Sequence, residues 1–153
     1  MNKKRLFAIV GPTAVGKTDI AIEVAKNIDA EIISADSMQI YKYMDIGTAK
    51  ATPQQQKQVK HYMIDVVYPD EEFSVADFQS MTKNCLARIY DSGKKPMIVG
   101  GTGLYVNSVC YNYTFSKIDK DEALREELRS EAVIYGNSFL YEKLKKVDPI
   151  AAK

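Results

Sequence analysis

Residues 5–18 read Arg-Leu-Phe-Ala-Ile-Val-Gly-Pro-Thr-Ala-Val-Gly-Lys-Thr, and this stretch decides the fold. A short apolar segment, predicted as a strand from Leu6 to Val10, leads into the pattern G-x-x-x-x-G-K-T at positions 11–18. A helix is predicted directly after it. A strand, this glycine-rich loop and a helix, in that order, are typical of a phosphate-binding loop (P-loop). The stretch therefore predicts a site for a di- or triphosphate, without fixing the reaction.

Each residue type in this loop suits a phosphate. Gly11 and Gly16 permit a positive φ and a close approach of the backbone to an anion. Successive backbone N–H groups and the positive end of the following helix then face that anion. Lys17 adds a charge for the outer phosphate, and the Thr18 hydroxyl suits Mg²⁺. The predicted phosphate-binding residues are Gly11, Pro12, Thr13, Ala14, Val15, Gly16, Lys17 and Thr18. A glycine-rich turn without a ligand is the less favoured alternative.

The composition is that of a soluble globular protein. Of 153 residues, 46% are hydrophobic and 27% are charged, which is ordinary for one domain with a real core. A net charge of +1 excludes a strongly basic nucleic-acid binder as a whole, but a local basic face stays open. No apolar run is long enough to span a membrane, and the first strand leaves no room for a signal peptide, so we expect a cytoplasmic protein. Cys85 and Cys110 lack metal-site spacing and are predicted to be buried thiols.

Strand and helix patterns alternate along the first two thirds of the chain. Strands are predicted at 6–10, 31–36, 62–67 and 96–99, and helices at 18–28, 53–59, 75–92 and from 104 onward. Thr52 and Ser74 each stand three residues before a Gln or Asp, which predicts capping boxes at two helix starts. The alternation predicts an α/β fold with a parallel sheet flanked by helices, like that of P-loop nucleoside triphosphate hydrolases.

The character of the sequence changes near Tyr113. Apolar residues at helical spacing on both sides of Gly136 predict two helices, which read as the start of a helical insertion subdomain. We therefore expect an α/β core at 1–113 and the beginning of a second domain at 114–153. Asp148-Pro149 predicts a further helix, yet only four residues follow, so the sequence looks cut off.

Polar residues follow two further predicted strands. The segment Ser34-Ala-Asp-Ser-Met-Gln39 follows one, and Gly100-Gly-Thr-Gly103 follows another. Ligand chemistry in such folds collects at the carboxyl ends of the parallel strands. We therefore expect Asp36 and Thr102 to face the same crevice as Lys17.

Six segments together resemble the tRNA dimethylallyltransferases, also called tRNA isopentenyltransferases. In family order and with family spacing, they are residues 11–18, 33–41, 44–50, 61–65, 73–78 and 99–105. The phosphate loop alone is shared with many protein families, whereas the segment 34–50 is far more specific. A Tyr stands at position 62 where the family usually has a second histidine.

The resemblance implies an enzyme that transfers a dimethylallyl group from dimethylallyl diphosphate to N6 of adenosine 37 in tRNA. Diphosphate leaves and Mg²⁺ assists. From its residue type Thr18 suits the ion, and for Asp36 two roles stay open, as the base or as a ligand of Mg²⁺ through water. In this family the phosphate loop holds the diphosphate of the prenyl donor, and whether ATP also binds stays open. We expect a monomer with tRNA as its partner.

The resemblance also implies roles for individual residues. Asp36 matches the general base, and Thr102 matches a residue at the reacting centre. The residues expected to touch tRNA are Asp36, Ser37, Met38, Gln39, Thr102 and Arg125. Family members are about twice as long as this chain, so the donor site looks complete and the acceptor site does not.

Other interpretations of the sequence remain. A P-loop kinase of small molecules or nucleotides shares the loop, but such kinases need several arginines and this chain has four in all. A donor-binding fragment without turnover is a second alternative, and a prenyltransferase of free adenine nucleotides is a third. Among single residues, Asp36 and Thr102 could serve only as caps, and Asp65 and His61 are expected to be structural.

Overall fold

The computed structural model describes residues 4–115 and 121–153. The chain divides into two compact units, residues 1–115 and residues 116–153. Each unit is described by itself. No helix within the described ranges is long and apolar enough to cross a membrane.

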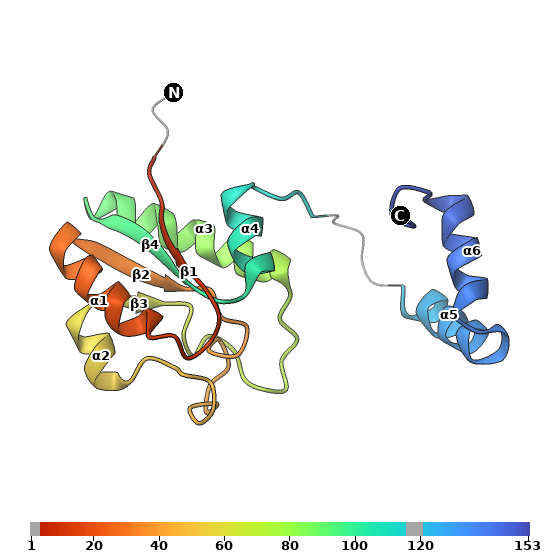
Figure 1. Cartoon of the computed structure of the whole chain (residues 1–153), viewed down its shortest axis with the longest axis horizontal. Coiled ribbons are helices and arrows are strands. Elements are labelled where there is room, and N and C mark those ends of the chain that lie inside the picture. The colour runs from red at the N-terminus through yellow and green to blue at the C-terminus, as the bar shows by residue number, and fades with distance from the viewer. Residues whose placement is uncertain (1–3, 116–120) are drawn as a thin grey trace. The chain divides into compact units, whose positions relative to one another are not determined.

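The first unit is built on a sheet of four parallel strands (Figure 1). The strands are β1 (Phe7–Val10), β2 (Ala30–Ser34), β3 (His61–Tyr62) and β4 (Lys95–Gly100), in the spatial order β1-β4-β2-β3. Val10 pairs with Gly100, and Ser34 pairs with Val99, so three strands end at the same edge of the sheet. The predicted parallel α/β sheet is confirmed.

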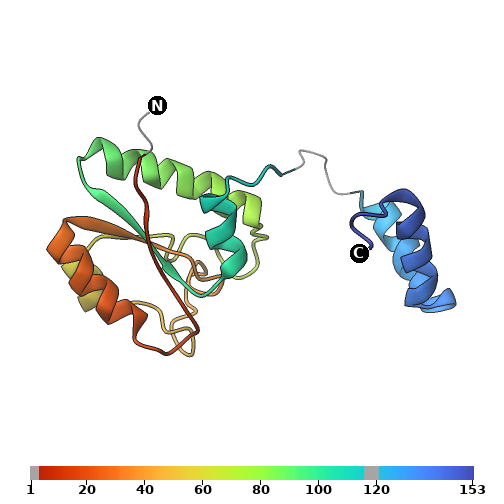
Figure 2. The same cartoon turned by 45° about the horizontal axis from the view of Figure 1, so that its top comes forward.

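Helices cover both faces of this sheet (Figure 2). On one face lies α1 (Lys17–Ile28), with the short α2 (Pro53–Gln58) on the same side. The other face carries α3 (Val75–Asp91) and α4 (Gly103–Cys110). The buried core is correspondingly in two parts, one for each face. At the centre of the second part, the rings of Phe78 and Tyr105 stack with centroids 4.1 Å apart.

Both predicted capping boxes are present. The Ser74 hydroxyl accepts a hydrogen bond from the Asp77 N–H, and the Asp77 carboxylate accepts one from the Ser74 N–H at 2.9 Å. The Ser74 hydroxyl also donates to the Asp77 carboxylate, and this bond, together with the one from the Ser74 N–H, holds the pKa of Asp77 below its usual value. Thr52 and Gln55 make the same reciprocal pair at the start of α2. Local side-chain chemistry therefore fixes the start of both helices.

The predicted strand at 62–67 is wrong beyond its first residue. Met63 and Asp65 have φ angles of 62° and 54°, which are left-handed and incompatible with an extended strand. The backbone N–H of Asp65 instead donates to the Gln39 carbonyl at 3.1 Å, and that of Val66 to the Ile40 carbonyl. This stretch thus pairs with the loop after β2, while Met63 is buried in the second part of the core and Val66 packs against it.

One prediction about the cysteines is also wrong. Cys85 is half-buried, and burial raises the pKa of its thiol. Cys110, by contrast, is exposed. It is the last residue of α4, a helix of only eight residues, so the apolar pattern that surrounds it does not extend the core to its position.

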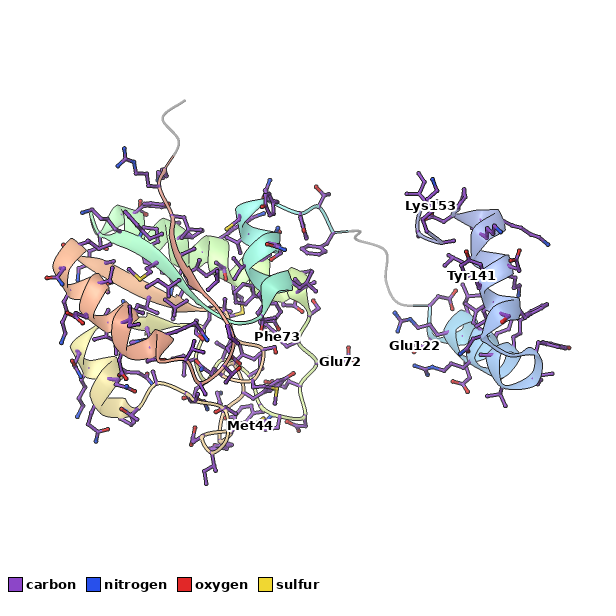
Figure 3. The ribbon with its side chains drawn as sticks, viewed as in Figure 1. Met44, Glu72, Phe73, Glu122, Tyr141 and Lys153 are labelled. Carbon is purple, nitrogen blue, oxygen red and sulfur yellow. The ribbon has the colours of Figure 1, made fainter. Side chains whose placement is uncertain are left out.

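The second unit contains α5 (Glu122–Tyr135) and α6 (Asn137–Val147), and Gly136 joins them with a φ of 82°. The Lys143 ammonium pairs with the Glu131 carboxylate at 2.6 Å and ties the two helices together. Figure 3 shows the side chains of this unit, with Glu122 and Tyr141 labelled. Asp148 was predicted to begin a helix, but its carboxylate caps a hydrogen-bonded turn by accepting from Ile150 and Ala151 N–H groups.

Gly100, where β4 ends, lies against the backbone of the neighbouring strand's continuation. A Cβ atom at this position would come within 2.2 Å of the Ala35 carbonyl oxygen. We expect Gly100→Ala to lower the free energy of unfolding by about 1–3 kcal/mol, because backbone cannot yield to overpacking. Urea unfolding followed by far-UV circular dichroism measures this. Gly103→Ala is the matched control, since its Cβ would meet no atom within 4 Å. Equal effects of the two substitutions would contradict the packing argument.

Candidate functional site

The glycine-rich loop between β1 and α1 turns through two left-handed residues. Ala14 has a φ of 65° and Gly16 a φ of 82°. Gly16 is also the N-cap of α1 and makes no side-chain capping bond, so the first amides of the helix are left to an external acceptor. The expected positive φ is confirmed at Gly16 but is wrong at Gly11, where a Cβ would meet only Lys17 and Val15 atoms at 3.8 Å or more. The other left-handed residue of the loop is instead Ala14, three residues after Gly11.

The Lys17 side chain folds back over this loop. Its ammonium donates a hydrogen bond to the Pro12 carbonyl. Residues 12–16 are exposed, whereas Lys17 and Thr18 are half-buried. A flexible ammonium over open backbone amides gives the loop the positive field that an anion requires.

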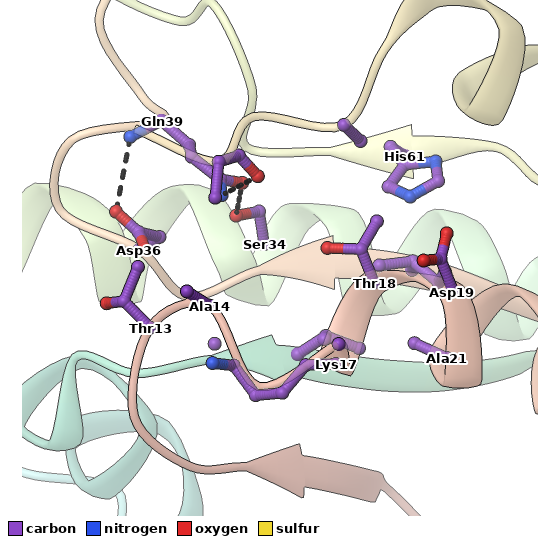
Figure 4. Close-up of a pocket in the computed structure, with 16 residues that line it drawn as sticks. Thr13, Ala14, Lys17, Thr18, Asp19, Ala21, Ser34, Asp36, Gln39 and His61 are labelled. Atoms are coloured by element: carbon purple, nitrogen blue, oxygen red, sulfur yellow. Dashed lines mark hydrogen bonds between the residues drawn. The ribbon is translucent and has the colours of Figure 1, made fainter. Parts of the chain in front are cut away.

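A pocket lies beside the loop at the carboxyl edge of the sheet (Figure 4). From the loop and α1 it is lined by Thr13, Ala14, Gly16, Lys17, Thr18, Asp19 and Ala21. From the strands and the segment after β2 it is lined by Ile32, Ser34, Asp36, Gln39, Ala49, Ala51, His61, Val99 and Gly100. The structure thus brings Lys17, Thr18 and Asp36 to one pocket, as the strand-end argument predicted.

Asp36 both lines this pocket and shapes its own loop. Its Oδ1 accepts hydrogen bonds from the Met38 N–H at 2.9 Å and the Gln39 N–H at 3.4 Å. Within the described ranges, the hydrogen bonds found for this carboxylate all end on Oδ1. The cap role is therefore real, yet it occupies only one carboxylate oxygen and leaves Oδ2 for a ligand in the pocket.

Gln39 ties the pocket wall together. The Ser34 hydroxyl donates to Gln39 Oε1 at 2.9 Å. The Gln39 Nε2 donates to the carbonyls of Thr48 and Ala49, at 3.2 and 3.0 Å. All the side-chain polar atoms of Gln39 are thus used to join β2 to the later part of the loop (Figure 4).

Thr102 lies outside the residues that line this pocket. Its Oγ1 accepts a hydrogen bond from the Ser37 N–H at 3.0 Å. Although Thr102 is the N-cap residue of α4, its side chain makes no capping bond, so the alternative that it only caps this helix is wrong. It holds Ser37, the residue after Asp36, and Met38 beyond it is exposed.

Arg125 lies on α5 in the second unit, and its side chain is exposed. The structure describes that unit by itself, so it does not bring Arg125 together with the pocket. The predicted contact of Arg125 with tRNA stays a prediction.

His61 belongs to the site although it was expected only as a structural residue. It lines the pocket from β3, and its Nδ1 donates to the Val59 carbonyl at 2.7 Å, which leaves Nε2 as an acceptor. Burial lowers the pKa of His61 below its ordinary value of 6.5, against an opposing effect of the bond to Val59. The pairing of β3 with β2 carries it to this edge, and no local sequence signal announces that pairing.

Comparisons with known proteins agree with this architecture. The sequence profile of the family described as IPP transferase matches residues 39–153. A tRNA dimethylallyltransferase from Thermoanaerobacter sp. (strain X514) is 53% identical over 149 residues, which are 97% of this chain and 47% of that protein. One from Bacillus subtilis (strain 168) is 52% identical over 99% of this chain and 48% of that protein. The chain spans about half the length of the curated relatives it matches.

Solved structures give the same result. The full-length tRNA isopentenylpyrophosphate transferase from Bacillus halodurans is 49% identical, with a TM-score of 0.73 over 98% of this chain and 50% of that one. A eukaryotic dimethylallyltransferase, described as acting on tRNA, is 27% identical, with a TM-score of 0.76 over 98% of this chain and 37% of that one. These similarities do not favour the kinase alternative.

The half-buried position of the His61 imidazole leads to a prediction about the pH dependence of stability. As this is the one histidine of the chain, a nuclear magnetic resonance titration of its ring protons reports it alone, and we expect a pKa below 6.5. The unfolded chain keeps the ordinary pKa and binds the proton more readily. The free energy of unfolding should therefore fall as the pH drops from 6.5 toward the folded pKa.

The variant His61→Gln removes the titrating group and serves as the control. Its stability should change less between pH 7.5 and pH 5.5 than that of the unaltered chain. A measured pKa at or above 6.5 would show that the imidazole is open to water.

Proposed function

The chain belongs to the IPP transferase family, and we propose that the protein, at the full length of its relatives, transfers a dimethylallyl group from dimethylallyl diphosphate to N6 of adenosine 37 in tRNA. The observation that carries the proposal is the single pocket in which the phosphate loop and Asp36 meet. A diphosphate leaving group suits the loop, and an exocyclic amine suits a carboxylate base. The names of the relatives support tRNA as the acceptor.

In this proposal the phosphate loop holds the diphosphate of the donor. Negative charge develops on the diphosphate oxygens as the bond between C1 of the prenyl group and oxygen breaks. The open amides at the start of α1 and the Lys17 ammonium are placed to stabilise that charge. An isoprenoid diphosphate and a nucleotide offer the loop the same chemical group, so occasional binding of ATP is consistent with the same residues.

Asp36 accepts the proton. Adenine N6 forms its new bond to C1 of the prenyl group, and the amine loses one proton to the carboxylate as diphosphate departs. A stacked adenine cannot reach a pocket, so the base must leave the stack of the anticodon loop. The two N–H donors bind Oδ1 and leave Oδ2 for the amine.

Mg²⁺ fits the residues of this pocket. It prefers few protein oxygens together with water and phosphate oxygens, and Thr18 and Asp36 offer a hydroxyl and a carboxylate. Across the described residues there is no group of three or more acidic, His or Cys side chains that could hold a metal alone. Thr18 would hold the ion directly and Asp36 through water, and the bound ion would neutralise charge on the diphosphate.

The acceptor side is the less complete half of the proposal. Ser37, Met38 and Gln39, with Thr102 behind them, would border the flipped adenosine, and Arg125 would contact tRNA from the second unit. We propose that the second unit, within the predicted segment 114–153, begins a tRNA-binding subdomain. We also propose a monomer that acts in the cytoplasm, where tRNA is used.

Asp36 and Lys17 should affect the reaction differently. We expect Asp36→Asn to lower kcat at least 100-fold with little change in the KM for the donor, because proton removal is lost. Lys17→Ala should raise the KM for the donor in addition to lowering kcat, since it removes a charge from the phosphate loop. A steady-state assay with labelled dimethylallyl diphosphate, Mg²⁺ and unmodified tRNA measures both.

The controls for this assay are Asp91→Asn and Lys57→Ala, which alter exposed residues outside the pocket. Both should stay within twofold of the unaltered protein. The present chain and the full-length protein are assayed side by side, and activity of the full-length protein alone would identify residues 1–153 as a donor-binding part. No transfer by either protein would end the proposal.

Thr18 should govern the requirement for metal. We expect Thr18→Val to raise the Mg²⁺ concentration needed for half-maximal activity by about tenfold, because the substitution keeps the shape and removes the hydroxyl ligand. A titration of activity with Mg²⁺ tests this, with Thr13→Val as the matched control from the same pocket wall. An unchanged Mg²⁺ requirement would show that the hydroxyl does not ligate the ion.

A further inference from the structure

Lys50 is a buried cation with no place in the site described above. Its side chain is only 5% exposed, although it belongs to a segment of loop. Its ammonium donates to Asp45 Oδ1 and Asp65 Oδ1, each at 2.7 Å, and to the Tyr41 carbonyl at 2.9 Å. Three acceptors use all three donors of a lysine ammonium, so the charge is fully paired.

The segment held by this ammonium lacks regular structure. Residues 35–51 form no helix and no ladder strand, and one isolated bridge joins Tyr41 to Val67. Met44 lies in this segment (Figure 3). Such a stretch keeps its shape only through contacts with other parts of the chain. Lys50 supplies three of these at once, to points 5, 9 and 15 residues away.

The same segment forms one wall of the pocket. Ala49 and Ala51, the two neighbours of Lys50, line the pocket, and Ala49 has a left-handed φ of 50°. The Ala49 carbonyl accepts from the Gln39 side chain, and the Gln39 N–H donates to Asp36 Oδ1. A continuous chain of contacts thus runs from the Lys50 ammonium to the Asp36 carboxylate.

The contact between Lys50 and Asp65 gives a second connection from Lys50 to Gln39. The Asp65 N–H donates to the Gln39 carbonyl at 3.1 Å, so the residue that pairs with Lys50 also holds Gln39 from the backbone. Asp65 has a left-handed φ of 54°, an uncommon conformation for Asp that persists only where surrounding contacts fix it. Gln39 is therefore held by Ala49, the chain neighbour of Lys50, and by Asp65, which pairs with the Lys50 ammonium.

We propose that Lys50 is a positioning residue, which clamps the segment 36–51 as a pocket wall and through Gln39 fixes the orientation of the Asp36 carboxylate. Lys50 itself is not among the residues that line the pocket, so it acts without touching a ligand. This inference rests on the proposed function for its catalytic consequence, but the clamp itself is a physical claim about the chain.

The clamp is tested first by hydrogen exchange. In Lys50→Met the stem and its packing remain while the three bonds are lost. We expect amide exchange to rise at least tenfold in peptides that cover 36–41 and 63–67, with α1 and α3 unchanged. Lys42→Met is the matched control, because the Lys42 ammonium lies 3.8 Å from the centre of the Tyr68 ring and, in the part of the chain that the structure describes, makes none of the carboxylate pairs that Lys50 makes. Unchanged exchange in Lys50→Met would overturn the clamp, whatever the enzyme does.

The consequence for the proposed reaction is tested by kinetics on the full-length protein. We expect Lys50→Met to lower kcat by about 10- to 100-fold, since a displaced base is a costly defect, with the KM for the donor within twofold. Lys50→Arg should restore part of kcat, as it keeps the charge but not the geometry.

A second variant covers the case in which Lys50→Met fails to fold. Asp65→Asn removes one charged partner that is 44% exposed, and it should shift exchange and kcat in the same direction by a smaller amount. A loss of thermal stability with kcat unchanged in Lys50→Met would reduce Lys50 to a purely structural residue. An unaltered full-length protein without transfer activity would end the proposed function, while the exchange result would still decide the clamp.

Discussion

The position of β4 between β1 and β2 is the constraint on which the pocket depends. Both β1 and β2 take their register from β4, and the three strands therefore end side by side. The phosphate loop continues from the first end and the segment that carries Asp36 from the second. The third end, at Gly100, has to be small, because the backbone at Ala35 crosses it with no room for a side chain. One glycine thus allows the two halves of the site to meet.

The two walls of the pocket are held in place by different kinds of interaction. The phosphate-loop wall lies between a strand and a helix of 12 residues, so regular structure positions it and leaves its amides open to a ligand. The opposite wall has no regular structure, and side-chain bonds from Ser34, Gln39 and Lys50 hold it to the rest of the fold. One wall of the pocket, the phosphate loop, is thus positioned by regular structure, and the other is held by side-chain hydrogen bonds. This division suits the proposed reaction, in which one substrate is a small diphosphate and the other is a large RNA.

Sequence patterns predicted the parts of the fold that depend on local chemistry. The phosphate loop, the capping boxes at Thr52 and Ser74, and the helix break at Gly136 are all short-range signals, and the structure has each of them. The end of β3 escaped prediction because Met63 and Asp65 adopt left-handed angles that residues of their type seldom take. His61 escaped for another reason, since its partner strand, β2, lies far away in the sequence. Lys50 escaped because its three partners, 5, 9 and 15 residues away, follow no helix or strand spacing. Periodicity cannot show such contacts, although the position of polar residues at the ends of predicted parallel strands did bring Asp36 and Lys17 together before the geometry was known.

The strand order also has a consequence for folding while the chain is being synthesised on the ribosome. β1 is the first strand to emerge, yet its one partner within the described residues, β4, is the last strand of the sheet to be made. Until residue 100 has left the exit tunnel, β1 exposes both of its edges, and the crossover helices can cover only an incomplete sheet. Translation speed between residues 10 and 100 therefore sets how long an apolar, unpaired strand is available to chaperones or to neighbouring nascent chains.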